Sequence, residues 1–167
     1  MIIRKPLSLL IAIALIVISG CSVKNAMPDE MPNDFEFSVQ FGVGSKNEIN
    51  TFNNTVTKDL VVDGTITKKI PLTKEEIKSV YEKMKQINVL EPKKLEQKKK
   101  RCMQTPYSED KWKIKLNGET ITFYLSEEYC NYTNDAKQLI ELRNYIFDIV
   151  LNKDEYKKLP EPSGGYK

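Results

Sequence analysis

The chain has 167 residues, with 26 Lys and Arg against 23 Asp and Glu, and it lacks histidine. The absence of histidine removes the commonest general base and the commonest metal ligand of proteins. The near-neutral charge balance gives no support for a nucleic-acid-binding protein, and no motif indicates a cofactor or a metal site.

Residues 1–20 have the pattern of a bacterial secretion signal. Arg4 and Lys5 form a short basic segment, and an apolar run over 7–18 follows it. The sequence Ile18-Ser19-Gly20-Cys21 resembles the lipobox of bacterial lipoproteins, in which an aliphatic residue and two small residues precede a cysteine. Cleavage before Cys21 would leave this residue as a lipidated N-terminus, which predicts a cell-membrane protein anchored on the extracytoplasmic face.

Two other interpretations of this segment stay open. A retained transmembrane anchor is disfavoured, because about 12 apolar residues are fewer than the roughly 20 that span a bilayer. An ordinary cleaved signal with an unrelated cysteine is the other alternative. Lipidation matters energetically, since one acyl chain holds a protein reversibly whereas two or more anchor it stably.

Removal of residues 1–20 leaves 147 residues and a net charge of +1, because this segment holds two basic residues and no acidic ones. This length suits one domain. Residues 21–34 are polar, contain two prolines and lack periodicity, which is typical of a flexible tether. We therefore expect a tether over 21–34, a single α+β domain over 35–159 and an extended, exposed tail over 160–167.

The strand pattern is clearest over 35–43, where apolar and polar residues alternate and predict one buried face. A turn over 44–47 follows. Asp63-Gly64 lies between two short runs and suits a two-residue hairpin turn. Such a turn would pair Val62 with Thr65, Val61 with Ile66 and Leu60 with Thr67.

A helix is predicted to begin after Thr73, which forms a capping box with Glu76. Apolar residues follow at helical spacing, and Pro92 is expected to end the helix. A second helix is predicted from Thr133 or Asn134 to Leu151 by a broad apolar stripe.

Asn117-Gly118 predicts a second hairpin between these helices. A two-residue loop pairs Leu116 with Glu119, Ile114 with Ile121 and Trp112 with Phe123. One face is then apolar, and the other carries Lys113, Lys115, Thr120, Thr122 and Tyr124. The predicted fold is α+β, with two helices packed on one face of an antiparallel sheet of about five strands.

Cys102 and Cys130 form an even pair outside the lipobox. Extension of the second hairpin would place Cys130 opposite Thr105, near Cys102. A disulfide between them suits an oxidising compartment and would stabilise the fold by about 3–4 kcal/mol on the chain-entropy model. Two free thiols remain an alternative, and a redox-active pair is disfavoured because the C-x-x-C spacing is absent.

A basic run lies between the first helix and the second hairpin. It consists of Lys93, Lys94, Lys98, Lys99, Lys100 and Arg101. Contact with an anionic polymer or lipid surface would make binding salt-sensitive. We favour the alternative of a solvated loop because the spacing shows no specificity.

Carboxylates are the remaining acid–base candidates. Glu109 and Asp110 precede Trp112, and Glu127 and Glu128 follow the last predicted strand. Glycosidases use such pairs with carboxyl groups about 5–9.5 Å apart, but no spacing here marks a particular pair.

Three groups of residues carry a family resemblance. They are Phe41-Gly42-Val43-Gly44 with 47–52 and 57–59, Leu72–Glu76 with Tyr81–Met84, and the tail from Tyr156 through Pro162 to Tyr166. This pattern, over most of residues 35–167, resembles small secreted or lipid-anchored proteins of Bacillus-type bacteria. The resemblance implies a Gram-positive protein facing the wall, and it implies no activity.

The leading hypothesis is a non-enzymatic surface lipoprotein. Its domain would bind an envelope protein or an anionic envelope polymer, with the membrane engaged through the lipid anchor. The alternative is a carboxylate-dependent envelope hydrolase, which requires two of the four carboxylates above to line one cleft.

Overall fold

The computed structural model describes residues 26–96, 103 and 105–167. Within these ranges it contains six strands and three helices. The strands are β1 (Glu36–Phe41), β2 (Asn47–Asn50), β3 (Thr55–Asp59), β4 (Thr65–Lys69), β5 (Glu109–Leu116) and β6 (Glu119–Ser126). The helices are α1 (Lys74–Gln86), α2 (Asn134–Leu151) and α3 (Asp154–Lys157).

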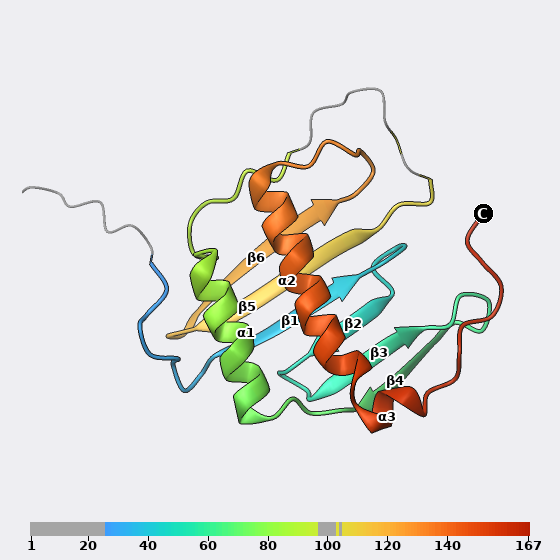
Figure 1. Ribbon diagram of the computed structural model, residues 1–167, viewed down its shortest axis with the longest axis horizontal. Helices are drawn as coiled ribbons and strands as arrows, with labels where there is room; N and C mark the ends of the chain where they lie inside the picture. Colours follow the sequence, from blue (N-terminus) through green and yellow to red (C-terminus); the bar gives the residue numbers. More distant parts are fainter. Residues whose placement is uncertain (1–25, 97–102, 104) are drawn as a thin grey trace, which may run out of the picture.

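The six strands form one antiparallel sheet in the order β4-β3-β2-β1-β5-β6. α1 and α2 lie side by side across one face of this sheet (Figure 1). The predicted α+β class is confirmed, with six strands in place of about five. The additional strand, β2, escaped prediction because it has four residues, of which only Ile49 is buried.

The core lies between the helices and the sheet face beneath them. β1 contributes Phe37 and Val39, and β5 contributes Trp112 and Ile114, all at most 2% exposed. Val80, Tyr81 and Met84 of α1 and Leu139, Ile146 and Val150 of α2 cover these side chains and are fully buried. Because each large apolar side chain gains about 1.5–3 kcal/mol on burial, this layer supplies the main stabilisation of the fold.

The predicted hairpin around Asn117-Gly118 is confirmed in every pair. Asn117 and Gly118 have φ of 51° and 77°, as a two-residue turn that follows the twist of the strands requires. The carboxylate of Asp34 accepts hydrogen bonds from both turn amides at 2.8 and 2.7 Å. The segment just before β1 is therefore hydrogen-bonded to the turn of the β5–β6 hairpin.

The predicted register of the first hairpin is wrong by three residues. Asp59, rather than Val62, pairs with Thr65, and the amide of Leu60 donates to Gly64 O at 2.8 Å. A longer loop forms because the Asp59 carboxylate accepts from the amide of Val61 at 2.9 Å. Val61 also forms a bridge with Ser163, so contacts from the C-terminal tail favour this loop.

The predicted capping box of α1 is confirmed, and α2 begins at Asn134 as predicted. α1 ends at Gln86, earlier than Pro92, because Asn88 has a positive φ of 44° and reverses the chain direction. The short α3 was not predicted. Its Tyr156 is buried and meets the ring of Phe147 edge-on.

Residues 26–34 do not form a free tether, which corrects the interpretation of 21–34; residues 21–25 lie outside the described ranges. Met27 is 6% exposed, and its amide donates to Asn88 Oδ1 at 3.3 Å. The Tyr81 hydroxyl lies 2.6 Å from Pro28 O, and Lys85 pairs with Asp29 at 3.0 Å. The side chain of Met27 is thus part of the core beside α1.

The C-terminal tail is exposed over most of 160–167, as expected, but it also contacts the domain. Tyr166 donates a hydrogen bond to the carboxylate of Asp59, and the Lys46 ammonium lies 4.9 Å from the centre of the Tyr166 ring. These contacts join the tail to the loop that follows β1 and to the end of β3.

We predict that Tyr81→Phe will release the segment 26–34. Removal of the hydroxyl leaves the Pro28 carbonyl without its donor, which should lower the free energy of unfolding by about 1 kcal/mol. Urea denaturation measures this loss, and amide hydrogen exchange should show faster exchange of the Met27 amide. Tyr145→Phe on α2 is the control, and unchanged exchange in Tyr81→Phe would contradict the assigned role of this hydroxyl.

Candidate functional site

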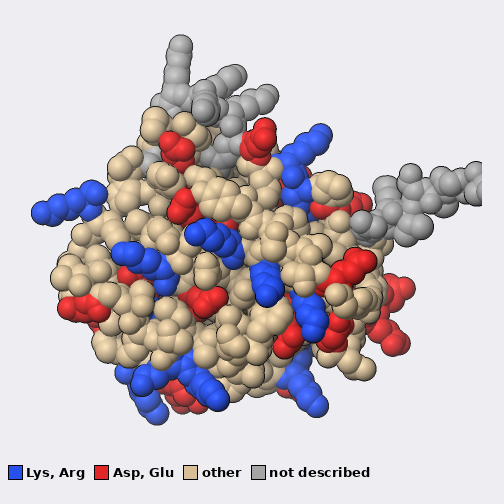
Figure 2. Space-filling model, turned by 180° about the vertical axis from the view of Figure 1, so that it is seen from behind, with Lys and Arg blue, Asp and Glu red and all other residues tan. Residues whose placement is uncertain are grey.

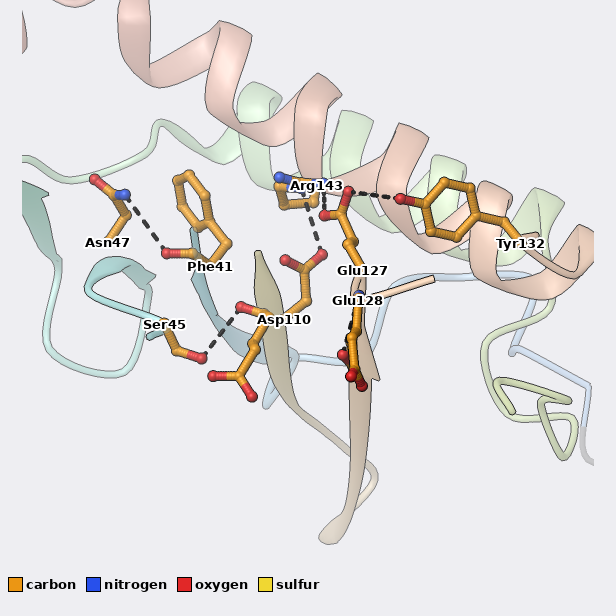
Figure 3. A network of polar contacts seen from close by, with 10 residues as sticks. Phe41, Ser45, Asn47, Asp110, Glu127, Glu128, Tyr132 and Arg143 are labelled. Carbon is orange, nitrogen blue, oxygen red and sulfur yellow. Dashed lines mark hydrogen bonds and ion pairs between the residues drawn. The ribbon is translucent and has the colours of Figure 1, made fainter. Parts of the chain in front are cut away.

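A buried cluster of charges joins the open end of the β5–β6 hairpin, opposite its turn, to α2 (Figure 3). The Nε atom of Arg143 lies 3.3 Å from Asp110 Oδ2, and its Nη2 lies 2.7 Å from Glu127 Oε1. The side chains of Arg143, Asp110 and Glu127 are 11%, 0% and 16% exposed. One guanidinium therefore bridges two carboxylates beneath the helix.

The alternation of β5 places Asp110 in the core. Asp110 shares a strand face with Trp112, Ile114 and Leu116, all of which point toward the helices. Arg143 reaches it from α2, with its guanidinium carbon 5.8 Å from the centre of the Phe41 ring. Tyr132 contributes a long hydrogen bond of 3.5 Å to Glu127 Oε2, and Figure 3 shows the side chains of Asp110, Glu127 and Tyr132 gathered around the Arg143–Glu127 contact.

The pKa of Asp110 is raised to about 7, because burial raises it more than the neighbouring Arg143 guanidinium lowers it, and the nearby Glu127 carboxylate adds a smaller increase. Neither oxygen of Asp110 has a hydrogen-bond partner among the described residues, so its charge is stabilised mainly by the ion pair. A carboxyl with this pKa is near half protonation at neutral pH, which is a property shared by many catalytic acids.

The four carboxylates predicted as acid–base candidates do not form one exposed cleft. Only Asp110 and Glu127 meet, and both face the same guanidinium. Glu109 lies on the opposite sheet face, where it accepts a hydrogen bond from Tyr124 and raises the pKa of that phenol to about 12. Asp110 has no exposed surface, so substrate does not reach it in this conformation.

The second candidate site is the face of the sheet that α1 and α2 leave open, which we call the open face. The strand registers align polar side chains across all six strands in two rows. One row contains Thr67, Thr57, Glu48, Gln40, Lys111 and Tyr124, and the next contains Lys69, Thr55, Asn50, Ser38, Lys113 and Thr122. Figure 2 shows the molecule from this side, with lysines over the middle of the view and both signs of charge around them.

A groove of about 450 Å³ lies at the centre of the open face. Its lining includes Ser38, Gln40, Glu48, Asn50, Phe52, Asn53, Lys111 and Lys113. Glu48 Oε1 accepts from Gln40 Nε2 at 3.4 Å and from Asn50 Nδ2 at 3.3 Å. The Lys113 ammonium lies 4.8 Å from the centre of the Phe52 ring. The groove thus combines amides, a carboxylate, ammonium groups and one aromatic ring.

The described part of the basic run has structural contacts. Lys93 Nζ donates to the carbonyl of Ile87 at 2.6 Å, at the C-terminal end of α1. The backbone amide of Lys94 donates to Asp135 Oδ2 at 2.8 Å. Lys98, Lys99, Lys100 and Arg101 lie outside the described residues, so polyanion contact through this run stays a prediction.

Cys21 and Cys102 also lie outside the described residues, and their lipidation and pairing stay predictions. Met103 and Tyr129 form an antiparallel bridge. This bridge differs by three residues from the register of the β5–β6 hairpin, which would have placed Thr105 opposite Cys130.

Sequence reasoning missed both Arg143 and the open-face groove. The sequence contained a signal for the burial of Asp110, because this residue continues the alternation of Trp112 and Ile114 toward the helix-covered face. Arg143 gave no comparable signal, since charged residues are common beside an apolar helix stripe. The groove depends on β2, whose side chains carry no strong strand pattern.

Neither a scan of protein-family models nor a search of curated proteins finds a match to this chain. Within the described ranges, no helix has the length and apolar character needed to cross a bilayer. In the same ranges, no three acidic or cysteine side chains gather closely enough to hold a metal ion.

The buried cluster predicts a specific pH dependence of stability. The pKa of Asp110 is about 7 in the folded protein against 3.8 for an ordinary aspartate, so the folded state holds this proton more tightly. The resulting stabilisation is complete below about pH 4 and is lost as the pH rises through about 7. The loss should be on the order of 1–4 kcal/mol.

Asp110→Asn should remove this contribution. Urea denaturation from pH 4 to pH 8 should show a smaller loss of stability in the variant than in the wild type. Asp148→Asn, at an exposed position of α2, is the matched control and should keep the wild-type slope. Parallel slopes for wild type and Asp110→Asn would show that Asp110 does not titrate between folded and unfolded states as assigned.

Proposed function

We propose that this protein is a surface lipoprotein, anchored through Cys21, whose domain is a non-enzymatic binding module for an envelope protein or polymer. The observation that carries the proposal is the open face, with its central groove. A sheet packed on one side only leaves a broad surface available to a partner.

The chemistry of the open face favours a polar partner. The rows across the strands consist of hydroxyls, amides, carboxylates and lysines, and the larger apolar side chains lie beneath the helices. The large hydrophobic residues exposed within the described ranges are Val62, Met103, Tyr124 and Leu151. They come from separate elements, whereas a stable protein interface usually has an apolar, desolvated centre. This pattern favours a polymer over an apolar protein surface.

A carboxylate-dependent hydrolase is the second candidate function. It is favoured by the meeting of Asp110 with Glu127 and by the raised pKa of Asp110. A catalytic pair needs contact with a substrate. Because Asp110 is fully buried and Arg143 occupies the space between the carboxylates, we favour a structural role for this cluster.

The anchor is tested by the intact mass of the protein from its native host and by its partitioning into membranes. We expect a diacylglyceryl mass on a chain that starts at Cys21, and a membrane-bound protein. Cys21→Ala should lose both properties. An unmodified chain that keeps Met1 would contradict the lipoprotein proposal.

The binding role is tested by co-sedimentation of the purified full-length lipoprotein, in detergent, with isolated cell-wall material. Lys111→Gln combined with Asn50→Ala should reduce the bound fraction at least about 10-fold, equivalent to about 1.4 kcal/mol. Lys137→Gln combined with Glu141→Ala changes exposed positions on α2 and is the matched control. Equal retention of both double variants would show that the open face is not the binding surface.

A further inference from the structure

We infer that the open-face groove binds an acidic glycan, that is, a hydroxyl-rich sugar chain that carries carboxylate groups. This inference rests on the binding role proposed above and names the ligand class for the same site. It follows from three features of the groove, namely its paired amide and carboxylate groups, its aromatic wall and its lysines.

The first feature suits sugar hydroxyls. Gln40 faces Glu48 and Ser38 faces Asn50 across β1 and β2, so four polar side chains lie on adjacent positions of two paired strands. Glu48 Oε1 accepts from both amides, which orients the rest of each amide group. An amide donates and accepts hydrogen bonds, as a hydroxyl does, and a cluster of amides can therefore engage neighbouring hydroxyls of one sugar.

The second feature is the aromatic side chain of Phe52. It is half-buried at the groove wall, next to the exposed Asn53. A half-buried ring offers apolar area to the C–H face of a sugar at little conformational cost, because it has few rotatable bonds. The groove volume of about 450 Å³ is within the range of sites that hold small ligands.

The third feature is charge. Lys111 and Lys113 line the groove from β5. Among the described residues, the neighbouring Lys115 pairs with Glu36 at 3.7 Å, and no ion pair within 4 Å engages Lys111 or Lys113. Two ammonium groups favour an anionic ligand. The carboxylate of Glu48 in the same groove repels a densely charged anion. A sugar chain with spaced carboxylates therefore suits the groove better than a chain of contiguous phosphates.

The test is calorimetric titration of the full-length lipoprotein in detergent with three probes. Tetragalacturonate carries sugars and carboxylates, chitotetraose carries sugars without charge, and inorganic polyphosphate carries charge without sugars. We expect binding of tetragalacturonate at least 10-fold tighter than that of either other probe. Lys111→Gln should weaken it about 5–10-fold and reduce its salt dependence. Asn50→Ala should weaken it while the salt dependence persists, and Lys93→Gln should leave it unchanged.

Other outcomes overturn the inference. Equal binding of polyphosphate would show attraction by charge alone, and equal binding of chitotetraose would show that acidity is irrelevant. A loss of binding in Lys93→Gln with none in Lys111→Gln would place the contact on the basic run. In a further outcome, none of the three probes binds, while the open-face variants still bind less cell-wall material in the co-sedimentation experiment. In that case the binding role stands and the glycan assignment fails. Circular dichroism of each variant checks that it is folded.

Discussion

The alternation of side chains along the two central strands decides how the whole molecule is organised. Phe37 and Val39 of β1 lie across from Ile114 and Trp112 of β5, and all four point toward the helices. Burial of this one face draws α1 and α2 onto it, because apolar surface gains free energy when it leaves water. The same alternation directs Ser38 and Lys113 to the other side. The covered core and the open face are thus two consequences of one pattern.

The helix-covered core also contains the buried charge cluster of Asp110, Arg143 and Glu127. Asp110 takes a position in the strand where an apolar residue would pack, and its burial carries a desolvation cost that Arg143 only partly offsets. Glu127 gives the guanidinium a second carboxylate. An ion pair of this kind contributes little net stability compared with apolar packing, but removal of one partner leaves an uncompensated charge. The cluster therefore ties α2 to the end of the β5–β6 hairpin in a defined position.

Local signals with a direct stereochemical basis were the predictable part of this fold. The Asn117-Gly118 turn and the Thr73–Glu76 capping box each depend on residues close in sequence, and the structure has both as predicted. The unpredicted parts depend on distant contacts. The register of β3 against β4 follows a loop that meets Ser163 of the tail, and no local pattern contains that information.

The same distinction separates the two candidate sites. Alternation along one strand was enough to place Asp110 among core residues, but its partner Arg143 comes from a helix later in the chain. The groove needs β2 beside β1, and β2 is recognisable only once Ile49 is seen to face the core. A site assembled from paired strands becomes visible in the register, because the register brings Gln40, Glu48 and Lys111 into one row.

The burial of Met27 constrains how a lipidated form would sit at the membrane. Met27 is already buried beside α1, and it lies six residues after Cys21. A fully extended chain of that length reaches about 20 Å, which is less than the width of a domain of this size. A lipid on Cys21 would therefore hold the domain close to the headgroups, without the long tether that the composition of 21–34 suggests. A ligand of the open face would then have to reach the membrane-proximal zone of the envelope, which favours a long, flexible polymer over a partner confined to the outer wall.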